Sequence, residues 1–254
     1  KSPFIYGILR WVSDRQFLTA DRVGVQSPGN LDYLRATRNR PLVNFEVLEN
    51  WLAPIPPNAS NDCQMDLGEL FGDRVIFVYA GNIGSAQRLD LLVQAFGSEQ
   101  LVDKVGFLLI GRGDSYDSVL EMISQFQFTN VVLKPEISEQ ELIGSLGRAD
   151  FGVVSLDPRH VTHNIPGKFL TYLRSGLPVL AAVNENNDLI DLIHDSGVGR
   201  AVSAVTSDSI IEAINELLGM KEEDIALAER CRSLFETRYH LDHAVNHLST
   251  MSSS

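Results

Sequence analysis

From Arg74 onward the sequence alternates regularly between short apolar segments and helical segments, and this alternation restricts the possible folds more than any other feature. We expect strands at residues 75–79, 105–110, 131–134, 151–155, 179–183 and 199–202. Helical patterns lie between them, near residues 87–97, 115–126, 138–148, 166–175 and 187–195. Such alternation is typical of parallel strands joined by right-handed helical crossovers. The sequence therefore predicts an α/β fold, a doubly wound parallel sheet with helices on both faces.

The segment before residue 74 lacks this alternation. An amphipathic helical pattern covers residues 4–20, and short strands are expected at 22–26 and 45–48 with a helix around 31–36. Residues 50–62 hold three prolines in a polar setting, which favours a stiff linker between two bodies.

Three helical patterns follow the last strand. Residues 207–219 predict a helix that stops at Gly219, and further helices are expected at 221–238 and 241–250. His243 and His247 lie one helical turn apart, a spacing that metal sites use, but no third ligand stands at a convincing spacing. We therefore expect a solvated helix face and no metal.

The charge and cysteine content limit the partners and the compartment. The 254 residues carry a formal net charge of −12, whereas nucleic-acid binding needs a basic face. A nucleotide needs only a local cationic pocket. Cys63 and Cys231 are the only cysteines and give neither a disulfide framework nor metal spacing, which indicates a reducing compartment. No apolar run reaches the length of a membrane span.

The stretch from His163 to Val183 contains the most informative local pattern. Pro166 and Gly167 open a helix after a loop, and Lys168 places a positive charge in its first turn. Free N–H groups and the helix dipole attract anions to a helix start at the edge of a parallel sheet. Gly176 is the expected left-handed cap. We interpret this helix start as a binding site for the phosphates of a nucleotide.

Glycine-rich segments follow two of the other strands. Ligands of open parallel sheets bind beyond the carboxyl ends of the strands, where glycine allows close backbone approach. These glycines are Gly81, Gly84, Gly111 and Gly113. Arg112 stands directly at a strand end, and Arg88 faces either solvent or a phosphate. Asp114 and Ser115 are expected to cap the next helix.

The order of these motifs resembles a known family. The segments FVYAGNIGSAQRLDLLVQAF, FLLIGRGD, NVVLKPEISEQELIGSLGRADFGVVSL and NIPGKFLTYLRSGLPVLA resemble the C-terminal half of the retaining GT-B glycosyltransferases, a glycosyltransferase 4-like family. The bacterial surface-polysaccharide branch is the most similar. ADRVGVQSPGNLDYL and VLENWL resemble the end of that family's N-terminal domain and the crossing between the domains.

The resemblance implies a Rossmann-like donor domain with a small remnant of the N-terminal domain. Residues 1–55 would end the N-terminal domain and make the crossing, residues 56–220 would bind the donor, and residues 221–254 would form C-terminal helices. The implied activity is transfer of a hexose, with retention, from a nucleoside-diphosphate sugar to a polysaccharide or lipid-linked acceptor. No cofactor is implied. The N-terminal GT-B domain is the implied partner, and the implied location is cytoplasmic, with the inner face of the membrane left open.

The resemblance also implies the donor-binding residues. Gly81 and Gly84 would lie against the diphosphate, Lys134, Pro135 and Glu136 beside the base, and Pro166, Gly167 and Lys168 at the phosphate and sugar. The remaining candidates are Asn82, Arg88, Gly111, Arg112, His163 and Thr171.

The chain departs from the family pattern at four positions. His163 and Thr171 stand where the family has two glutamates, and Asn82 and Gln87 stand where it has an arginine and a lysine. A non-catalytic nucleotide-sugar-binding or protein-interaction module is therefore an alternative, which Lys168→Ala would separate from the first reading. A sugar-nucleotide epimerase is a third reading, but it requires acidic residues in the cleft that the sequence does not locate.

Overall fold

The computed structural model describes residues 3–37, 45–56, 65–159 and 165–251 of the chain. The chain divides into two compact units, residues 1–49 and residues 50–254. The second unit contains the sheet on which the predicted site depends.

The first unit contains two helices and a parallel pair of strands. Its elements are α1 (Pro3–Thr19), β1 (Val23–Val25), α2 (Pro28–Thr37) and β2 (Phe45–Val47). Val23 pairs with Phe45, and the rings of Phe17 and Phe45 meet edge to face at 5.2 Å. These four elements lie where the sequence predicts them.

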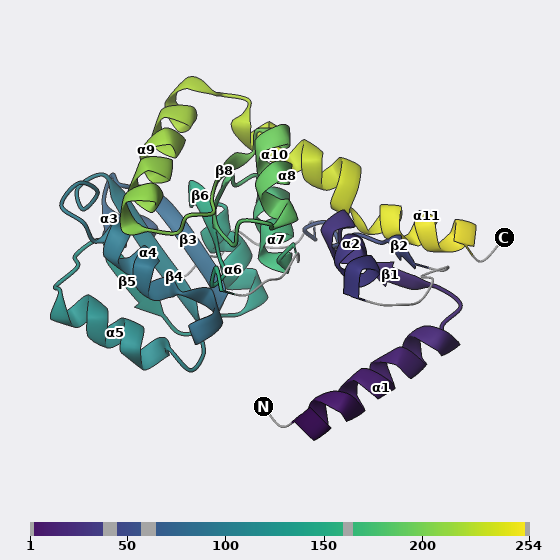
Figure 1. Ribbon diagram of the computed structural model, residues 1–254. Helices are drawn as coiled ribbons and strands as arrows, with labels where there is room; N and C mark the ends of the chain where they lie inside the picture. The colour runs from purple at the N-terminus through teal and green to yellow at the C-terminus, as the bar shows by residue number, and fades with distance from the viewer. Residues whose placement is uncertain (1–2, 38–44, 57–64, 160–164, 252–254) are drawn as a thin grey trace. The chain divides into compact units, whose positions relative to one another are not determined.

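The described part of the second unit contains a six-stranded sheet in which every neighbouring pair is parallel (Figure 1). Its strands are β3 (Val75–Asn82), β4 (Val105–Arg112), β5 (Val131–Lys134), β6 (Phe151–Ser155), β7 (Val179–Ala182) and β8 (Gly199–Val202). The spatial order is β5-β4-β3-β6-β7-β8. This is the Rossmann order 3-2-1-4-5-6, with the switch in strand order between β3 and β6. The predicted doubly wound α/β fold is confirmed.

Helices cover both faces of this sheet (Figure 1). They are α3 (Leu67–Phe71), α4 (Leu89–Phe96), α5 (Tyr116–Gln125), α6 (Glu139–Leu146), α7 (Gly167–Ser175), α8 (Asp188–Ser196), α9 (Ser207–Glu223) and α10 (Leu227–Leu234). The last described helix, α11 (Leu241–Met251), is not part of these two layers. Side chains of α3, α6, α7, α8 and α10 pack in one hydrophobic core, and those of α4, α5 and α9 pack in the other. Phe77 and Val78 of β3 belong to different cores, because successive side chains of a strand point to opposite faces.

Two expectations about the helices are wrong, and one helix was not expected. Gly219 does not end its helix, because α9 continues to Glu223 and nothing lies within 4 Å of a Cβ at that glycine. The single helix expected over 221–238 is α10 followed by a π-helical turn, Phe235–Tyr239. Helix α3 has only five residues, too few to show a helical period, and the sequence did not indicate it.

The segment that follows the division of the chain is bound to the second unit. Leu52 donates its N–H to the carbonyl oxygen of Tyr239 at 3.0 Å and accepts from the N–H of Leu241 at 3.2 Å. The buried guanidinium of Arg174 donates to the carbonyl oxygen of Ala53 at 2.9 Å. Part of the predicted linker, residues 57–62, lies outside the described residues.

Candidate functional site

The predicted glycine segments lie side by side at the carboxyl edge of the sheet. Gly81 pairs with Gly111, and Asn82 pairs with Arg112, so the two segments are the paired ends of β3 and β4. We expected them in loops, and the strands are longer than predicted because the glycine backbone extends the pairing. Lys134 ends β5 opposite Ile110, one register position before Gly111. The expectation that these groups share one rim is confirmed.

A cavity of about 410 Å³ opens at this edge. Its lining residues are Ala80, Gly81, Asn82, Ile110, Gly111, Arg112, Glu136, Ile137 and Leu142. Five of the predicted site residues are among them: Gly81, Asn82, Gly111, Arg112 and Glu136. The lining combines apolar side chains with bare backbone and two charges, which is a common composition for a small-molecule site.

Glycine is required at the rim of this cavity. Gly111 has φ of +156°, and a Cβ there would lie 1.8 Å from the carbonyl oxygen of Gly81. Gly81 has φ of +141°, and its Cβ would lie 3.2 Å from Nζ of Lys168. No larger residue fits at Gly111 without moving the backbone of β3.

Lys168 reaches the same rim from helix α7. Pro166 is the N-cap residue and not the first helical residue that the sequence predicts. The helix therefore begins one residue later, and Gly167 and Lys168 are its first two residues. Tyr172, one turn later in α7, accepts a hydrogen bond from the N–H of Ala80 in β3 at 3.0 Å. That bond joins the helix to the strand where β3 and β6 diverge.

The amine of Lys168 is held without a carboxylate partner among the described residues. Its Nζ lies 3.6 Å from the centroid of the Tyr79 ring. Burial lowers the pKa of Lys168 to about 7, because the charged form loses hydration and no described anion compensates. A partly buried cation of this kind can gain a large share of its missing stabilisation from a bound phosphate.

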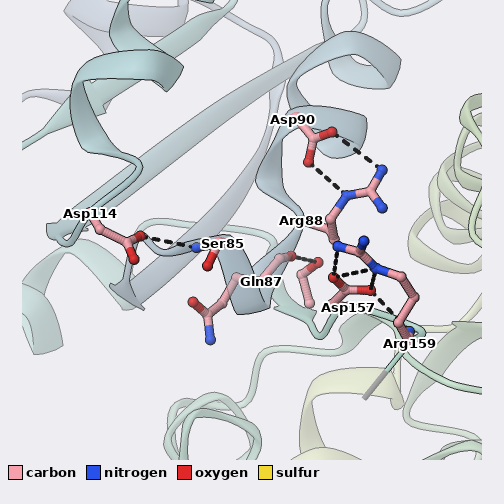
Figure 2. Close-up of polar contacts among 8 residues, drawn as sticks. Ser85, Gln87, Arg88, Asp90, Asp114, Asp157 and Arg159 are labelled. Atoms are coloured by element: carbon pink, nitrogen blue, oxygen red, sulfur yellow. Dashed lines mark hydrogen bonds and ion pairs between the residues drawn. The ribbon is translucent and has the colours of Figure 1, made fainter. Parts of the chain in front are cut away.

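The two predicted arginines are already paired. Arg112 and Glu136 form an ion pair at 3.0 Å across the cavity edge, and both side chains are exposed. Arg88 pairs with Asp90 at 3.1 Å and does not line the cavity (Figure 2). Arg88 also has φ of +46°, an uncommon backbone conformation for a residue other than glycine. A phosphate would have to compete with these carboxylates for either arginine.

The segment between β3 and α4 is fixed from two sides (Figure 2). The carboxylate of Asp114 accepts from the N–H of Ser85 at 3.0 Å, and Asp157 donates its N–H to the carbonyl oxygen of Ala86 at 2.8 Å. The hydroxyl of Ser155 donates to the carbonyl oxygen of Gln87. The expected capping role of Asp114 is therefore wrong: Ser115 occupies the N-cap of α5 and makes no side-chain cap bond. Asp114 instead bridges to the neighbouring glycine segment, where it satisfies a backbone donor.

Asp157 and Arg159 form a further ion pair beside this segment (Figure 2). The carboxylate of Asp157 is buried and accepts from the side chain and the N–H of Arg159, which lower its pKa to about 2. Because the folded-state pKa lies below the unfolded value, the ionised carboxylate stabilises the fold above about pH 4. That stabilisation is lost as the pH falls towards 2.

We expect Asp157→Asn to lower the free energy of unfolding at neutral pH and to flatten its decline in acid. Urea denaturation at a series of pH values measures both effects. Asp32→Asn is the matched control, since Asp32 is exposed and pairs with Arg35 within one helix. An acid profile for Asp157→Asn that superimposes on the wild-type profile would contradict this role.

The other predicted residues that the structure describes do not line the 410 Å³ cavity. Lys134 lines a separate cavity of about 240 Å³ with Met65, Ile137, Glu141 and Ser145. Gly84 precedes the short 3₁₀ turn Ser85–Gln87, and Pro135 follows β5 directly. The Thr171 hydroxyl donates to the carbonyl oxygen of Gly167 at 3.3 Å within α7. His163 lies outside the described residues.

Sequence reasoning missed the roles of two tyrosines. Tyr79 and Tyr172 lie within the strand expected at 75–79 and the helix expected at 166–175, and the hydroxyl of each hydrogen-bonds the backbone of β3. A buried tyrosine hydroxyl needs a hydrogen-bond partner, so a tyrosine within an apolar strand end was an available signal.

The described residues show no arrangement for a metal and no membrane helix. No group of three or more His, Cys, Asp or Glu side chains among them is placed to hold a metal ion. His243 instead places Nε2 2.8 Å from the carbonyl oxygen of Glu236. None of the helices in the described ranges is both long and apolar enough to cross a membrane.

A parallel sheet in this order, with a cavity at the carboxyl ends of its central strands, defines a Rossmann-like α/β protein. The sequence model of the family Glycosyl transferases group 1 matches residues 74–220, which is more than half of the chain. The chain belongs to this family. The match covers all six strands of the main sheet, and the family resemblance inferred from the motifs is confirmed. A comparison with curated proteins gave no match.

Solved glycosyltransferase structures share the fold at low sequence identity. WaaG, a glycosyltransferase involved in lipopolysaccharide biosynthesis, superimposes with a TM-score of 0.67 at 15% identity over 85% of this chain and 59% of its own. Anabaena HepE in complex with UDP-glucose gives 0.73 at 14% over 92% and 64%. Sucrose-phosphate synthase from Thermosynechococcus elongatus gives 0.74 at 17% over 92% and 58%. The chain thus spans about three fifths of the length of these proteins and has their GT-B fold.

Proposed function

We propose that this chain is the donor-binding half of a bacterial retaining glycosyltransferase. The enzyme transfers a hexose from a nucleoside-diphosphate sugar to a polysaccharide or lipid-linked acceptor in the cytoplasm. The family membership supports glycosyl transfer. The complexes of HepE with UDP and with UDP-glucose support a nucleoside-diphosphate sugar as the donor.

One observation carries the proposal: the amine of Lys168 lies beside Gly81, at the rim of the 410 Å³ cavity, with no described carboxylate in contact. A diphosphate at this rim brings the counter-charge that the amine lacks. The N-terminus of α7 adds free N–H groups and the positive end of its dipole. The base then lies towards Ile110, Ile137 and Leu142, whose side chains line the cavity.

The chemistry that follows from this geometry is electrostatic. When the bond between the sugar and the diphosphate breaks, negative charge develops on the departing phosphate oxygen. The ammonium of Lys168 and the N-terminus of α7 stabilise that charge without reorganising, which lowers the barrier. The acceptor is bound by the N-terminal domain, to which residues 1–55 contribute the end and the crossing between the domains.

The direct test is isothermal titration calorimetry of the chain with UDP, GDP and their sugars. We expect weak binding, with a dissociation constant on the order of 100 μM, because Arg112 at the rim and Arg88 in the segment after β3 are each paired with a carboxylate. We expect no sugar transfer by this chain alone. Absence of binding to every nucleotide would contradict the proposal, and turnover by the chain alone would contradict its assignment as one half of an enzyme.

The paired arginines also favour a second candidate, a non-catalytic binding or interaction module. Arg88 and Arg112 are each engaged by a carboxylate, and Asn82 and Gln87 bond to each other at 2.9 Å. Such a module does not depend on the charge of Lys168. Loss of nucleotide binding in Lys168→Ala supports the first function, and unchanged binding supports the second.

A further inference from the structure

The aromatic ring beneath Lys168 is the starting point. The amine lies 3.6 Å from the centroid of the Tyr79 ring. This is closer than in the other described cation–π contacts, Arg15 over Trp11 at 5.4 Å and Arg238 over Tyr239 at 5.6 Å. The face of an aromatic ring attracts a cation through its quadrupole, most strongly where water is excluded. The Tyr79 side chain is fully buried. Its ring is therefore the described group that stabilises the charged form of Lys168.

The hydroxyl of Tyr79 hydrogen-bonds the backbone at the end of β3. It donates to the carbonyl oxygen of Asn82 at 2.6 Å, across the glycine at position 81. Burial raises the pKa of Tyr79, so the hydroxyl keeps its proton and remains a donor at neutral pH. One rigid side chain thus contacts both the cation from α7 and the backbone at the end of β3.

We propose that Tyr79 is a positioning residue of the donor site: its ring holds the ammonium of Lys168 beside Gly81, and its hydroxyl fixes the carbonyl group of Asn82. The inference rests on the proposed function. Tyr79 is not among the residues that line the cavity, so it acts through Lys168 and Asn82. Loss of its ring leaves the amine without a favourable contact until the phosphate arrives.

A purely structural role is the competing explanation, and the chain offers a matched control. Phe77 lies two residues earlier in β3, is equally buried and packs against Phe96 and Phe151. Neither of these ring partners is a residue of the proposed site. Phe77→Leu therefore reproduces the loss of a buried ring from the same strand and the same core.

The test is a double-mutant cycle read by calorimetry with UDP and with GDP on the chain. The variants are Tyr79→Leu, Tyr79→Phe, Lys168→Met, Tyr79→Leu with Lys168→Met, and Phe77→Leu. We expect Tyr79→Leu to weaken binding about tenfold, and Tyr79→Phe, which keeps the ring, to weaken it only about threefold. In the Lys168→Met background Tyr79→Leu should cost about threefold, the part that belongs to the hydroxyl. Phe77→Leu should bind as the wild type does.

The outcomes separate this inference from the proposed function. If the wild-type chain binds neither nucleotide, both fail. If it binds but Tyr79→Leu costs the same with and without Lys168, or Phe77→Leu weakens binding equally, only the positioning role is overturned. Thermal unfolding of each variant shows whether it is folded. If Tyr79→Leu does not fold, Tyr79→Phe still tests the proposal. No loss of affinity in Tyr79→Phe would overturn the role of the hydroxyl.

Discussion

Replacing Gly111 by alanine should lower the free energy of unfolding by about 4 kcal/mol, a loss well above that of most single substitutions. The new Cβ would lie 1.8 Å from the carbonyl oxygen of Gly81, and the residue would have to keep φ of +156°. The strand ends must separate to relieve both problems. Urea denaturation gives the loss of stability directly, and nucleotide binding should disappear with it.

Gly219→Ala is the control for this substitution. Gly219 lies inside α9, and nothing stands within 4 Å of a Cβ built there. Alanine should stabilise the helix by about 1 kcal/mol, because it loses less backbone freedom on folding. A loss of less than about 1 kcal/mol in Gly111→Ala would show that the contact between β3 and β4 is not as close as the structure has it.

Lys168→Met should have the largest effect on binding, weakening the affinity for nucleoside diphosphates by about 10- to 100-fold at neutral pH. The substitution keeps most of the length of the side chain and removes the ammonium that we propose contacts phosphate. In the wild type the affinity should fall as the pH rises above about 7, because the free protein then loses the proton from Lys168. Calorimetry at several pH values measures both effects.

Stability should change with pH in the opposite direction. The folded-state pKa of Lys168 lies below its unfolded value, so the unfolded chain binds more protons between about pH 7 and 10. The lysine's contribution therefore makes the fold more stable as the pH rises through this range, and Lys168→Met should remove that contribution. Lys221→Met is the control and should leave this pH dependence of stability in place. Lys221 pairs with Asp150, which precedes β6 and so lies at the other end of the strands. An affinity that does not depend on pH in this range would contradict the role of Lys168.

The sheet could be predicted from the sequence because burial leaves a strong pattern. Strands β5, β6 and β8 have the predicted bounds, and β7 has four fully buried residues, as expected for a strand covered on both faces. The sequence also indicates the start of α7 to within one residue and its cap at Gly176, with φ of +77°, since proline and glycine have specific backbone preferences.

The polar contacts of the site could not be predicted in the same way. Ser85 and Asp114 are 29 residues apart, and the Arg112–Glu136 pair depends on two strand ends that meet only in the folded sheet. Such pairings leave no periodic trace in one sequence. The two tyrosines were missed because an apolar pattern records where a side chain is buried, and it does not record what the hydroxyl contacts.

A crystal structure of the chain with UDP or GDP tests the central claim most directly. We predict both phosphates at the carboxyl ends of β3 and β4, with a phosphate oxygen within hydrogen-bond distance of Nζ of Lys168 and the base in the 410 Å³ cavity. A diphosphate bound elsewhere on the chain, with Lys168 still resting on the Tyr79 ring and the cavity empty, would contradict it.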